Sequence, residues 1–353
     1  MNTSEWLQRI DDFYTKKAPF ACYMSPESDI VVSYFQTDNE LHTASELTEE
    51  GFHIAPFLFN KTNYYLPREA CAMMQTQLAI SNQIIDKVAF DSTPEEHKKY
   101  EALVSKAISQ IETGSVDKIV VSMKKDVKLK QFSIVALVKQ LFSSYPAAFK
   151  YIWFHPKTGL WCGATPEILL KTDAVSFSTM ALAGTRVYDA RKEPQWQEKE
   201  LDEQQIVTDA ITDSLQKLST VFKISKTHNH KAGNLVHLRT DIAGILKKGN
   251  TGLNGIVSAL HPTPAICGRP KNLAAAFITE HEGYNREFYT GFVGPVAHKN
   301  TALYVNLRCL KIIDDQATLF VGGGITKASN PLAEWEETQN KLQTMLRVLY
   351  PML

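Results

Sequence analysis

The order of extended and helical segments is the feature that most constrains the fold of this 353-residue chain. Residues 148–154 and 160–170 are predicted to form a hairpin, and residues 301–313 and 317–321 a second pair of strands. Long helical segments separate these hairpins, but the regular strand–helix–strand alternation of a parallel sheet is missing. The sequence therefore predicts an α+β fold with mainly antiparallel strands.

One helix start divides the chain. Thr93 and Glu96 form a predicted capping box, and apolar residues then recur at helical spacing until Gly114, a plausible helix stop. We therefore expect an N-terminal portion over residues 1–90, which carries no motif, and a catalytic portion over residues 91–353. The two portions are expected to form one continuous structural domain.

Two further helices and two strands complete the prediction. Residues 195–218 have the pattern of a long helix, and Asn330 is predicted to start a final helix that runs to about Leu349. Residues 118–122 and 175–183 have the β-branched or alternating pattern of strands.

Composition excludes several classes of protein. Lys plus Arg and Asp plus Glu both number 38, so no net charge favours nucleic acid or an anionic membrane as a partner. No apolar run approaches the roughly 18 residues of a membrane span. The five cysteines are widely spaced and contain no CxxC motif, so neither a disulfide framework nor a zinc site is indicated. A reducing cytoplasm is the expected location.

Two acidic clusters indicate a metal site. Glu200 and Glu203 lie three residues apart on one predicted helix, and Glu334 and Glu337 do so on another, so each pair shares a helix face. Either cluster alone is more typical of a solvated charged face. The duplication favours a different interpretation, because four converging carboxylates would repel one another unless Mg²⁺ lay between them. Lys341 lies on the same face of the final helix.

Three charged residues lie among apolar neighbours. Burial of Glu167 would raise its pKa and suit a general acid, whereas burial of Lys118 would lower its pKa and suit a general base. A solvated lysine is the simpler alternative for Lys118. Arg308 interrupts an apolar predicted strand, and a buried arginine normally needs a carboxylate from the protein or from a substrate.

Two other motifs allow more than one interpretation. Glycines 322–324 follow a predicted strand and would let backbone N–H groups approach an anion, although a tight turn is the better explanation without context. His261 lies in a proline-rigid segment, where it is either a structural cap or a donor to a ligand. His228 and His230 are expected in a polar loop rather than as metal ligands. No GxGxxG, GxxxxGK[ST], GxSxG or HExxH motif is present.

Ten segments together resemble the chorismate-utilising enzymes, which include isochorismate synthase, salicylate synthase, and component I of anthranilate and aminodeoxychorismate synthases. In chain order, over some two-thirds of the sequence, they are 118–122 (KIVVS), 163–167 (GATPE), 182–186 (LAGTR), 199–203 (KELDE), 237–240 (HLRT), 260–264 (LHPTP), 286–291 (REFYTG), 307–309 (LRC), 322–325 (GGGI) and 334–341 (EWEETQNK). The chain departs from the usual pattern at Met123, where Arg is common, at Gln204, where His is common, and at Gly323, where Ala is common.

The resemblance implies a large αβ sandwich with two mainly antiparallel sheets and outer helices. It implies that Mg²⁺ is held by Glu203 and Glu337, with Glu200 and Glu334 close by and acting partly through water. The ring carboxylate of chorismate also binds this metal. Arg308 and Tyr289 would grip the enolpyruvyl carboxylate, helped by the glycines. The full set of expected substrate-binding residues is Gly184, Thr185, His261, Tyr289, Arg308, Gly323, Gly324 and Lys341.

Within the family, members that add water have lysine at the position of Lys118, and members that add ammonia typically have glutamine. Lys118 would be neutral and take a proton from water attacking C2, while Glu167 would donate a proton to the departing C4 hydroxyl. The resemblance thus implies isochorismate synthase, an isomerase of the hydroxymutase type that feeds menaquinone or siderophore biosynthesis.

Three alternatives stay open beside isochorismate synthase: salicylate synthase, anthranilate or aminodeoxychorismate synthase component I, and a non-catalytic chorismate-binding homologue, which Met123 would fit. Residues 183–185 contain no lysine, which argues against the aminodeoxychorismate synthases that form a covalent adduct. No amidotransferase subunit is expected with water as nucleophile, and family members of this type are often monomers.

Overall fold

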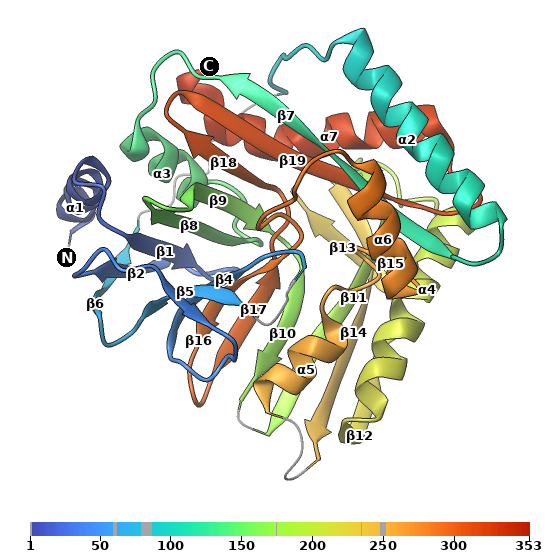
Figure 1. Ribbon diagram of the computed structural model, residues 1–353, viewed down its shortest axis with the longest axis horizontal. Helices are drawn as coiled ribbons and strands as arrows, with labels where there is room; N and C mark the ends of the chain where they lie inside the picture. The colour runs from blue at the N-terminus through green and yellow to red at the C-terminus, as the bar shows by residue number, and fades with distance from the viewer. Residues whose placement is uncertain (1, 59–61, 79–86, 174, 234, 248–251) are drawn as a thin grey trace.

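Two antiparallel sheets form the framework of the computed structural model, which describes residues 2–58, 62–78, 87–173, 175–233, 235–247 and 252–353 (Figure 1). The first sheet has nine strands in the described residues. Their spatial order is β15 (Gly268–Arg269), β7 (Lys118–Lys128), β19 (Gln316–Ile325), β18 (Cys309–Ile313), β9 (Gly159–Thr165), β8 (Phe149–His155), β1 (Phe20–Met24), β2 (Ile30–Gln36) and β6 (Cys71–Gln77).

The second sheet has ten strands in the same described ranges. Nine follow the order β12 (Ser219–Ile224), β14 (Leu235–Leu246), β11 (Ser176–Val187), β10 (Ile168–Thr172), β17 (Thr301–Val305), β16 (Phe292–Val296), β4 (Gly51–Ala55), β5 (Asn63–Pro67) and β3 (His42–Ala44), while β13 (His228–Ala232) pairs separately with β14. The predicted α+β sandwich with antiparallel sheets is confirmed.

Helices cover the outer faces of both sheets. They are α1 (Thr3–Thr15), α2 (Pro94–Glu112), α3 (Ile134–Ser143), α4 (Glu198–Gln216), α5 (Leu253–Leu260), α6 (Lys271–His281) and α7 (Pro331–Leu349), followed by a short 3₁₀ turn, Tyr350–Met352. Apolar residues of α1, α3 and α7 pack on the first sheet, and those of α4 and α5 pack on the second. A further cluster joins α2, α6 and α7 to β7.

An aromatic core fills the space between the sheets. Tyr304 of β17 stacks on Phe149 of β8 with ring centroids 4.0 Å apart, which joins the inner faces of the two sheets. At the crossing between them, the hydroxyl of Tyr151 donates to the amide oxygen of the fully buried Asn306 at 2.7 Å. The amide nitrogen of Asn306 donates to the carbonyl of Phe288.

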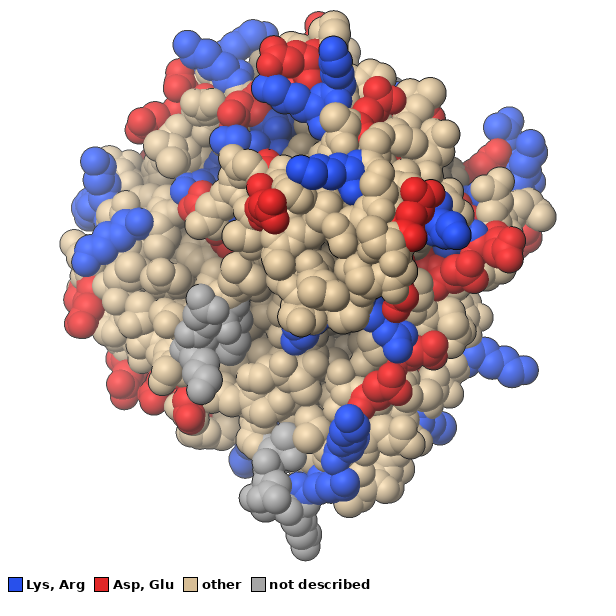
Figure 2. Space-filling view, turned by 45° about the vertical axis from the view of Figure 1, so that its right-hand side comes forward, with Lys and Arg blue, Asp and Glu red and all other residues tan. Residues whose placement is uncertain are grey.

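The N-terminal part of the chain contributes to both sheets. Strands β1, β2 and β6 form one edge of the first sheet, and strands β3, β4 and β5 form one edge of the second. The division at about residue 90 stays a prediction. None of the helices in the described part of the chain is long and apolar enough to cross a membrane. Acidic and basic side chains lie beside one another over the face in Figure 2, as the balanced composition predicts.

The capping signals predicted the helices well. Thr93 and Glu96 form the expected capping box at the start of α2, and Gly114 follows its end with a φ of 79°. Asn330 caps α7 by accepting from the N–H of Ala333. The helix predicted over residues 195–218 is α4.

Two strand predictions and one turn prediction were wrong. Residues 301–313 are not one strand, because the chain leaves β17 in the second sheet, turns through Arg308 at a φ of 46°, and enters β18 in the first. Residues 160–170 likewise divide between β9 and β10 in different sheets. Glycines 322–324 form no turn, since they lie within β19 and pair with β7. The periodicity of apolar residues along the chain does not indicate where the chain passes from one sheet to the other.

Candidate active site

A pocket lies where β7, β11 and β19 meet α4 and α7, with about 750 Å³ free of protein atoms including its open mouth. Most residues predicted from the sequence line it, although they come from widely separated segments. These are Glu167, Gly184, Thr185, Glu203, Tyr289, Arg308, Gly323, Gly324, Glu337 and Lys341. The pocket size is within the usual range for a small-molecule site.

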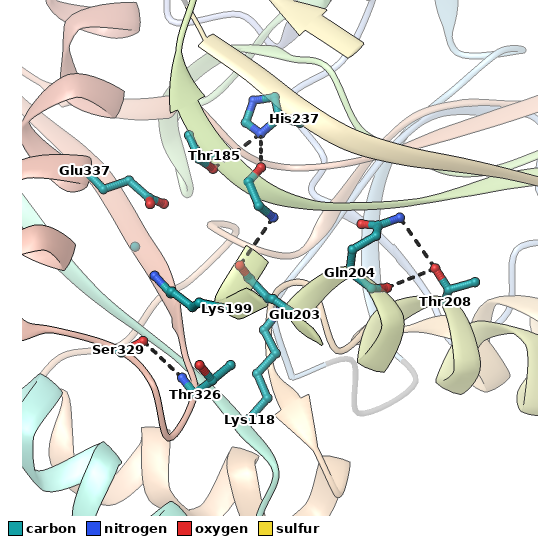
Figure 3. Close-up of polar contacts among 12 residues, drawn as sticks. Lys118, Thr185, Lys199, Glu203, Gln204, Thr208, His237, Thr326, Ser329 and Glu337 are labelled. Atoms are coloured by element: carbon teal, nitrogen blue, oxygen red, sulfur yellow. Dashed lines mark hydrogen bonds and ion pairs between the residues drawn. The ribbon is translucent and has the colours of Figure 1, made fainter. Parts of the chain in front are cut away.

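Two of the pocket glutamates form ion pairs with lysines. Glu203 of α4 forms an ion pair with Lys118, whose Nζ lies 2.9 Å from Oε1, and Glu337 of α7 forms one with Lys341, whose Nζ lies 2.7 Å from Oε1. Glu203 also accepts from the N–H of Gly184 at 3.3 Å (Figure 3). Burial acts to raise the pKa of Glu203, but the nearby ammonium groups, chiefly Lys118, outweigh it and hold that pKa below its ordinary value.

The other two glutamates of the clusters lie beside the pocket lining and also contact cations. Glu200 pairs with Arg186 at 3.1 Å. Glu334 pairs with Lys199, which reaches across from α4 to α7, and it accepts from Ser329 Oγ at 2.7 Å. Burial, followed by the charge of Glu337, raises the pKa of Glu334 to about 7.

These ion pairs occupy the carboxylates of the predicted metal centre. Within the described residues, no three His, Cys, Asp or Glu side chains are grouped so that they could hold a metal ion. In the structure, the repulsion among the four carboxylates is offset by three lysines and one arginine, where the sequence predicted a divalent cation.

The donor set nevertheless fits Mg²⁺, which prefers carboxylate oxygens. A Cβ on Gly324 would lie 2.2 Å from Glu203 Oε1, and one on Gly323 would lie 2.9 Å from Glu334 Oε2, so the glycines leave room for both carboxylates. Glu334 Oε2 is buried and accepts no hydrogen bond from the described residues. An orphaned buried oxygen beside acidic side chains is a place where a cation or its water would be stabilised.

Lys118 and Glu167 are both buried, as predicted. Lys118 is fully buried, opens β7 and contacts Glu203. Glu167 lies in the crossing from β9 to β10, where its backbone carbonyl accepts from the N–H of Val305. Burial raises the pKa of Glu167 to about 8, and the charge of Lys118 partly opposes this effect. A carboxyl with such a pKa is protonated at neutral pH.

Arg308 binds no carboxylate of the described chain. Its guanidinium donates to the carbonyl of Ala232 at 3.1 Å and to His237 Nε2 at 2.7 Å. His237 Nδ1 lies 3.0 Å from the carbonyl of Gly184 (Figure 3). The imidazole therefore connects Arg308 to the pocket wall of β11. Burial, and then the charge of Arg308, lower the pKa of His237, which is therefore neutral. Arg308 is thus a half-buried cation that lines the pocket and is available to an anionic ligand.

Two more predicted residues complete the pocket wall. Tyr289 is buried and stacks on Phe320 at 5.4 Å between centroids. Lys341 Nζ also donates to the carbonyl of Gly322 at 2.9 Å. His261 lies outside the pocket lining, where it ends α5 and its Nε2 lies 2.9 Å from the carbonyl of Phe57. This placement matches a structural cap, the other interpretation that its segment allows.

Sequence reasoning missed three residues of this region: Arg186, Lys199 and His237. All three stand within the motifs that carry the resemblance, which was the available signal. Their partners lie 14, 135 and 71 residues away, at Glu200, Glu334 and Arg308, so spacing alone could not reveal them.

Two departures from the usual pattern lie away from the pocket. Met123 packs in the apolar clusters between the first sheet and its outer helices. Gln204 donates to the carbonyl of Ala181 and to Thr240 Oγ1, within the second sheet. Neither side chain contributes to the pocket lining.

Comparisons with known sequences agree with this geometry. The chorismate binding enzyme family matches residues 61–350. The isochorismate synthase EntC of Escherichia coli is 33% identical over 284 residues, which make up 76% of this chain and 71% of that protein. The salicylate biosynthesis isochorismate synthase of Pseudomonas aeruginosa is 31% identical over 271 residues, or 73% of this chain and 56% of that protein.

The fold also matches a solved relative. The menaquinone-specific isochorismate synthase of Escherichia coli superposes with a TM-score of 0.78 over 94% of this chain and 88% of its own, at 21% identity. This likeness concerns the fold alone. Because the family model matches residues 61–350, most of the sequence, the chain belongs to the chorismate-binding enzyme family.

Proposed function

We propose that this protein is an isochorismate synthase, which converts chorismate to isochorismate with Mg²⁺. The observation that carries the proposal is a buried protonated carboxyl, Glu167, in the pocket lining, together with a buried lysine, Lys118, that lies behind the lining and contacts the pocket residue Glu203. Water is a poor nucleophile at neutral pH and needs a base, and the hydroxyl that leaves needs an acid. The two groups meet both needs.

The pocket residues have distinct roles in this proposal. Arg308 and Tyr289 bind the enolpyruvyl carboxylate, and His237 orients the guanidinium of Arg308. Lys118 takes a proton from water as its oxygen bonds to C2, and Glu167 gives a proton to the C4 hydroxyl as the C4–O bond breaks. The ring double bonds shift between these positions, so chorismate and isochorismate are isomers.

Mg²⁺ would be held by Glu203 and Glu337, with Glu200 and Glu334 close by, and when bound it neutralises the ring carboxylate of the substrate. The chain's own residues prepare this step. Lys118 must leave its contact with Glu203 before it can reach the attacking water, because its Nζ lies 2.9 Å from that carboxylate.

Two observations favour this function over two of the alternatives. Lys118 stands where ammonia-using members of the family typically have glutamine, so anthranilate and aminodeoxychorismate synthases fit less well. Met123, which could signal lost chemistry, packs in an apolar cluster and leaves the pocket complete, so a non-catalytic homologue also fits less well. Salicylate synthase, which would add pyruvate elimination, is the second candidate, and a relative of 31% identity is named for salicylate biosynthesis.

The test is incubation of the purified protein with chorismate, with and without Mg²⁺, followed by chromatography with a salicylate fluorescence readout. Mg²⁺-dependent isochorismate without salicylate or pyruvate is the expected result. Salicylate plus pyruvate would move the protein to the second candidate. If no chorismate is converted, even with ammonia added, the proposal that this protein is a catalyst is rejected. The product feeds menaquinone or siderophore biosynthesis.

Matched substitutions on α7 test the metal assignment. Glu337→Gln is expected to abolish Mg²⁺-dependent turnover, whereas Glu336→Gln, which changes an exposed neighbour, is expected to leave it intact. Mg²⁺ binding measured by calorimetry is expected to weaken in the first variant alone. Retained Mg²⁺ affinity in Glu337→Gln would remove that residue from the metal site.

A further inference from the structure

A buried ion pair lies behind the pocket wall and belongs to no role described so far. The guanidinium of Arg286 donates two hydrogen bonds to the carboxylate of Glu282, from Nε to Oε2 and from Nη2 to Oε1. The two side chains are 2% and 1% exposed. The remaining donors of Arg286 reach the carbonyls of Val120 at 2.7 Å and Ile266 at 3.0 Å, and the hydroxyl of Thr290 at 3.2 Å. All five N–H groups of the guanidinium are therefore used.

The three partners outside the pair come from three distant segments, and each of them lines the pocket. Val120 lies on β7, Ile266 precedes β15, and Thr290 follows Tyr289 with a φ of 58°. A single guanidinium thus fixes three walls of the pocket relative to one another. The ring centroid of Phe57 lies 4.5 Å from the Cζ atom of Arg286.

Glu282 holds the same strand at a second point. Its carboxylate accepts from the N–H of Ser122 at 2.7 Å and from Ser122 Oγ at 2.9 Å. Side chains two residues apart on a strand share one face, so Lys118, Val120 and Ser122 project toward the pocket side of β7. The ion pair therefore bonds to β7 at Val120 and Ser122, which follow Lys118 on this strand by two and four residues.

We propose that the Arg286–Glu282 pair positions β7 and the two facing loops for catalysis, without touching the substrate. This inference rests on the proposed function. A lysine at position 286 would preserve the charge but offers three donors from a point instead of a planar fork, so it cannot hold all three walls. A shift of about 1 Å in a reacting group can cost about 100-fold in rate.

The test compares Arg286→Lys with Lys125→Met. Lys125 lies on the same strand and forms a largely buried ion pair with Glu96 at 2.8 Å, but it is outside the pocket lining. Arg286→Lys is expected to lower kcat by about 10- to 100-fold with a smaller change in KM. Lys125→Met is expected to lower the melting temperature while kcat stays within twofold of wild type. Equal kcat losses in the two variants, or a wild-type kcat in Arg286→Lys, would overturn the proposal.

Ser122→Ala covers the possibility that Arg286→Lys does not fold. It removes one of the two Ser122 bonds to Glu282 and keeps the backbone bond, so a several-fold loss of kcat is expected in a folded protein. An unchanged kcat in this variant would contradict the positioning role.

Binding separates this proposal from the proposed function. If the wild-type protein turns over no chorismate, the proposed function fails, and the pair is then judged from chorismate affinity measured by calorimetry. Affinity lower in Arg286→Lys than in Lys125→Met would support the positioning role, and equal affinities would reject it.

Discussion

At the scale of the single residue, Lys118 makes the sharpest prediction. Lys118→Gln keeps a side chain of similar length but removes the base, so kcat for isochorismate formation is expected to fall by about 100- to 10,000-fold. Steady-state kinetics with product chromatography provides the measurement. The control is Lys124→Gln, which changes an exposed lysine of the same strand. Turnover near wild type in Lys118→Gln would show that another group activates water.

Arg308 is expected to act in binding rather than in proton transfer. Arg308→Ala removes a half-buried donor fork with no carboxylate partner in the described chain, and hydrogen bonds to charged groups contribute about 1.5 to 3 kcal/mol. The KM for chorismate should therefore rise by roughly 10- to 100-fold while kcat changes less. An unchanged KM would argue against a contact between this residue and the substrate carboxylate.

The pKa of Glu167 predicts the alkaline limb of the pH profile. Burial raises this pKa to about 8, so the carboxyl is protonated and able to donate below that pH, and it loses the proton as the pH rises through 8. We expect kcat measured from pH 6 to pH 9 to fall on the alkaline side, around pH 8. A kcat that stays level through pH 9 would exclude Glu167 as the acid.

At the scale of the element, the close approach of side chains to the glycines of β19 leads to a prediction. A Cβ on Gly324 would lie 2.2 Å from Glu203 Oε1 and 2.7 Å from Lys118 Cε, whereas one on Gly323 would meet only the ends of two side chains, at 2.9 and 3.4 Å. Gly324→Ala is expected to reduce turnover by at least tenfold, because it displaces the acidic side chain and the base (roughly 1 Å can cost 100-fold). Gly323→Ala, the matched control, should stay close to wild type. Equal losses of turnover in the two variants would mean that crowding at Gly324 does not determine the geometry of the site.

The same scale shows which elements sequence patterns could predict. The caps at Thr93 and Asn330 are local hydrogen bonds within three residues, so α2 and α7 could be predicted with their start points. The break between β17 and β18 could not, because both strands are apolar and the change of sheet at Arg308 leaves no periodic signal. Glycines 322–324 had the composition of a turn, but pairing with β7 keeps them extended.

At the scale of the whole molecule, the bond between Tyr151 and Asn306 couples the sheets. Tyr151→Phe leaves the amide oxygen of the fully buried Asn306 without that donor, which should lower the free energy of unfolding by about 1 to 3 kcal/mol. Denaturant unfolding followed by circular dichroism gives the value. Tyr350→Phe, at an exposed position, serves as control and should change stability by less than about 0.5 kcal/mol. Equal values for both variants would show that the buried bond contributes little.

The sequence by itself determined those features that have a local or chemical signature. Helix caps, hairpins and the α+β class follow from spacing along the chain, and the motifs identified the acidic clusters, Lys118, Glu167 and Arg308 as one chemical set. Only the tertiary structure decided how those groups are paired. Lys199 meets Glu334, His237 meets Arg308, and Arg286 bonds to three pocket walls, because the sheets bring together segments up to 166 residues apart. Such contacts depend on packing in space, for which a linear pattern carries no signal.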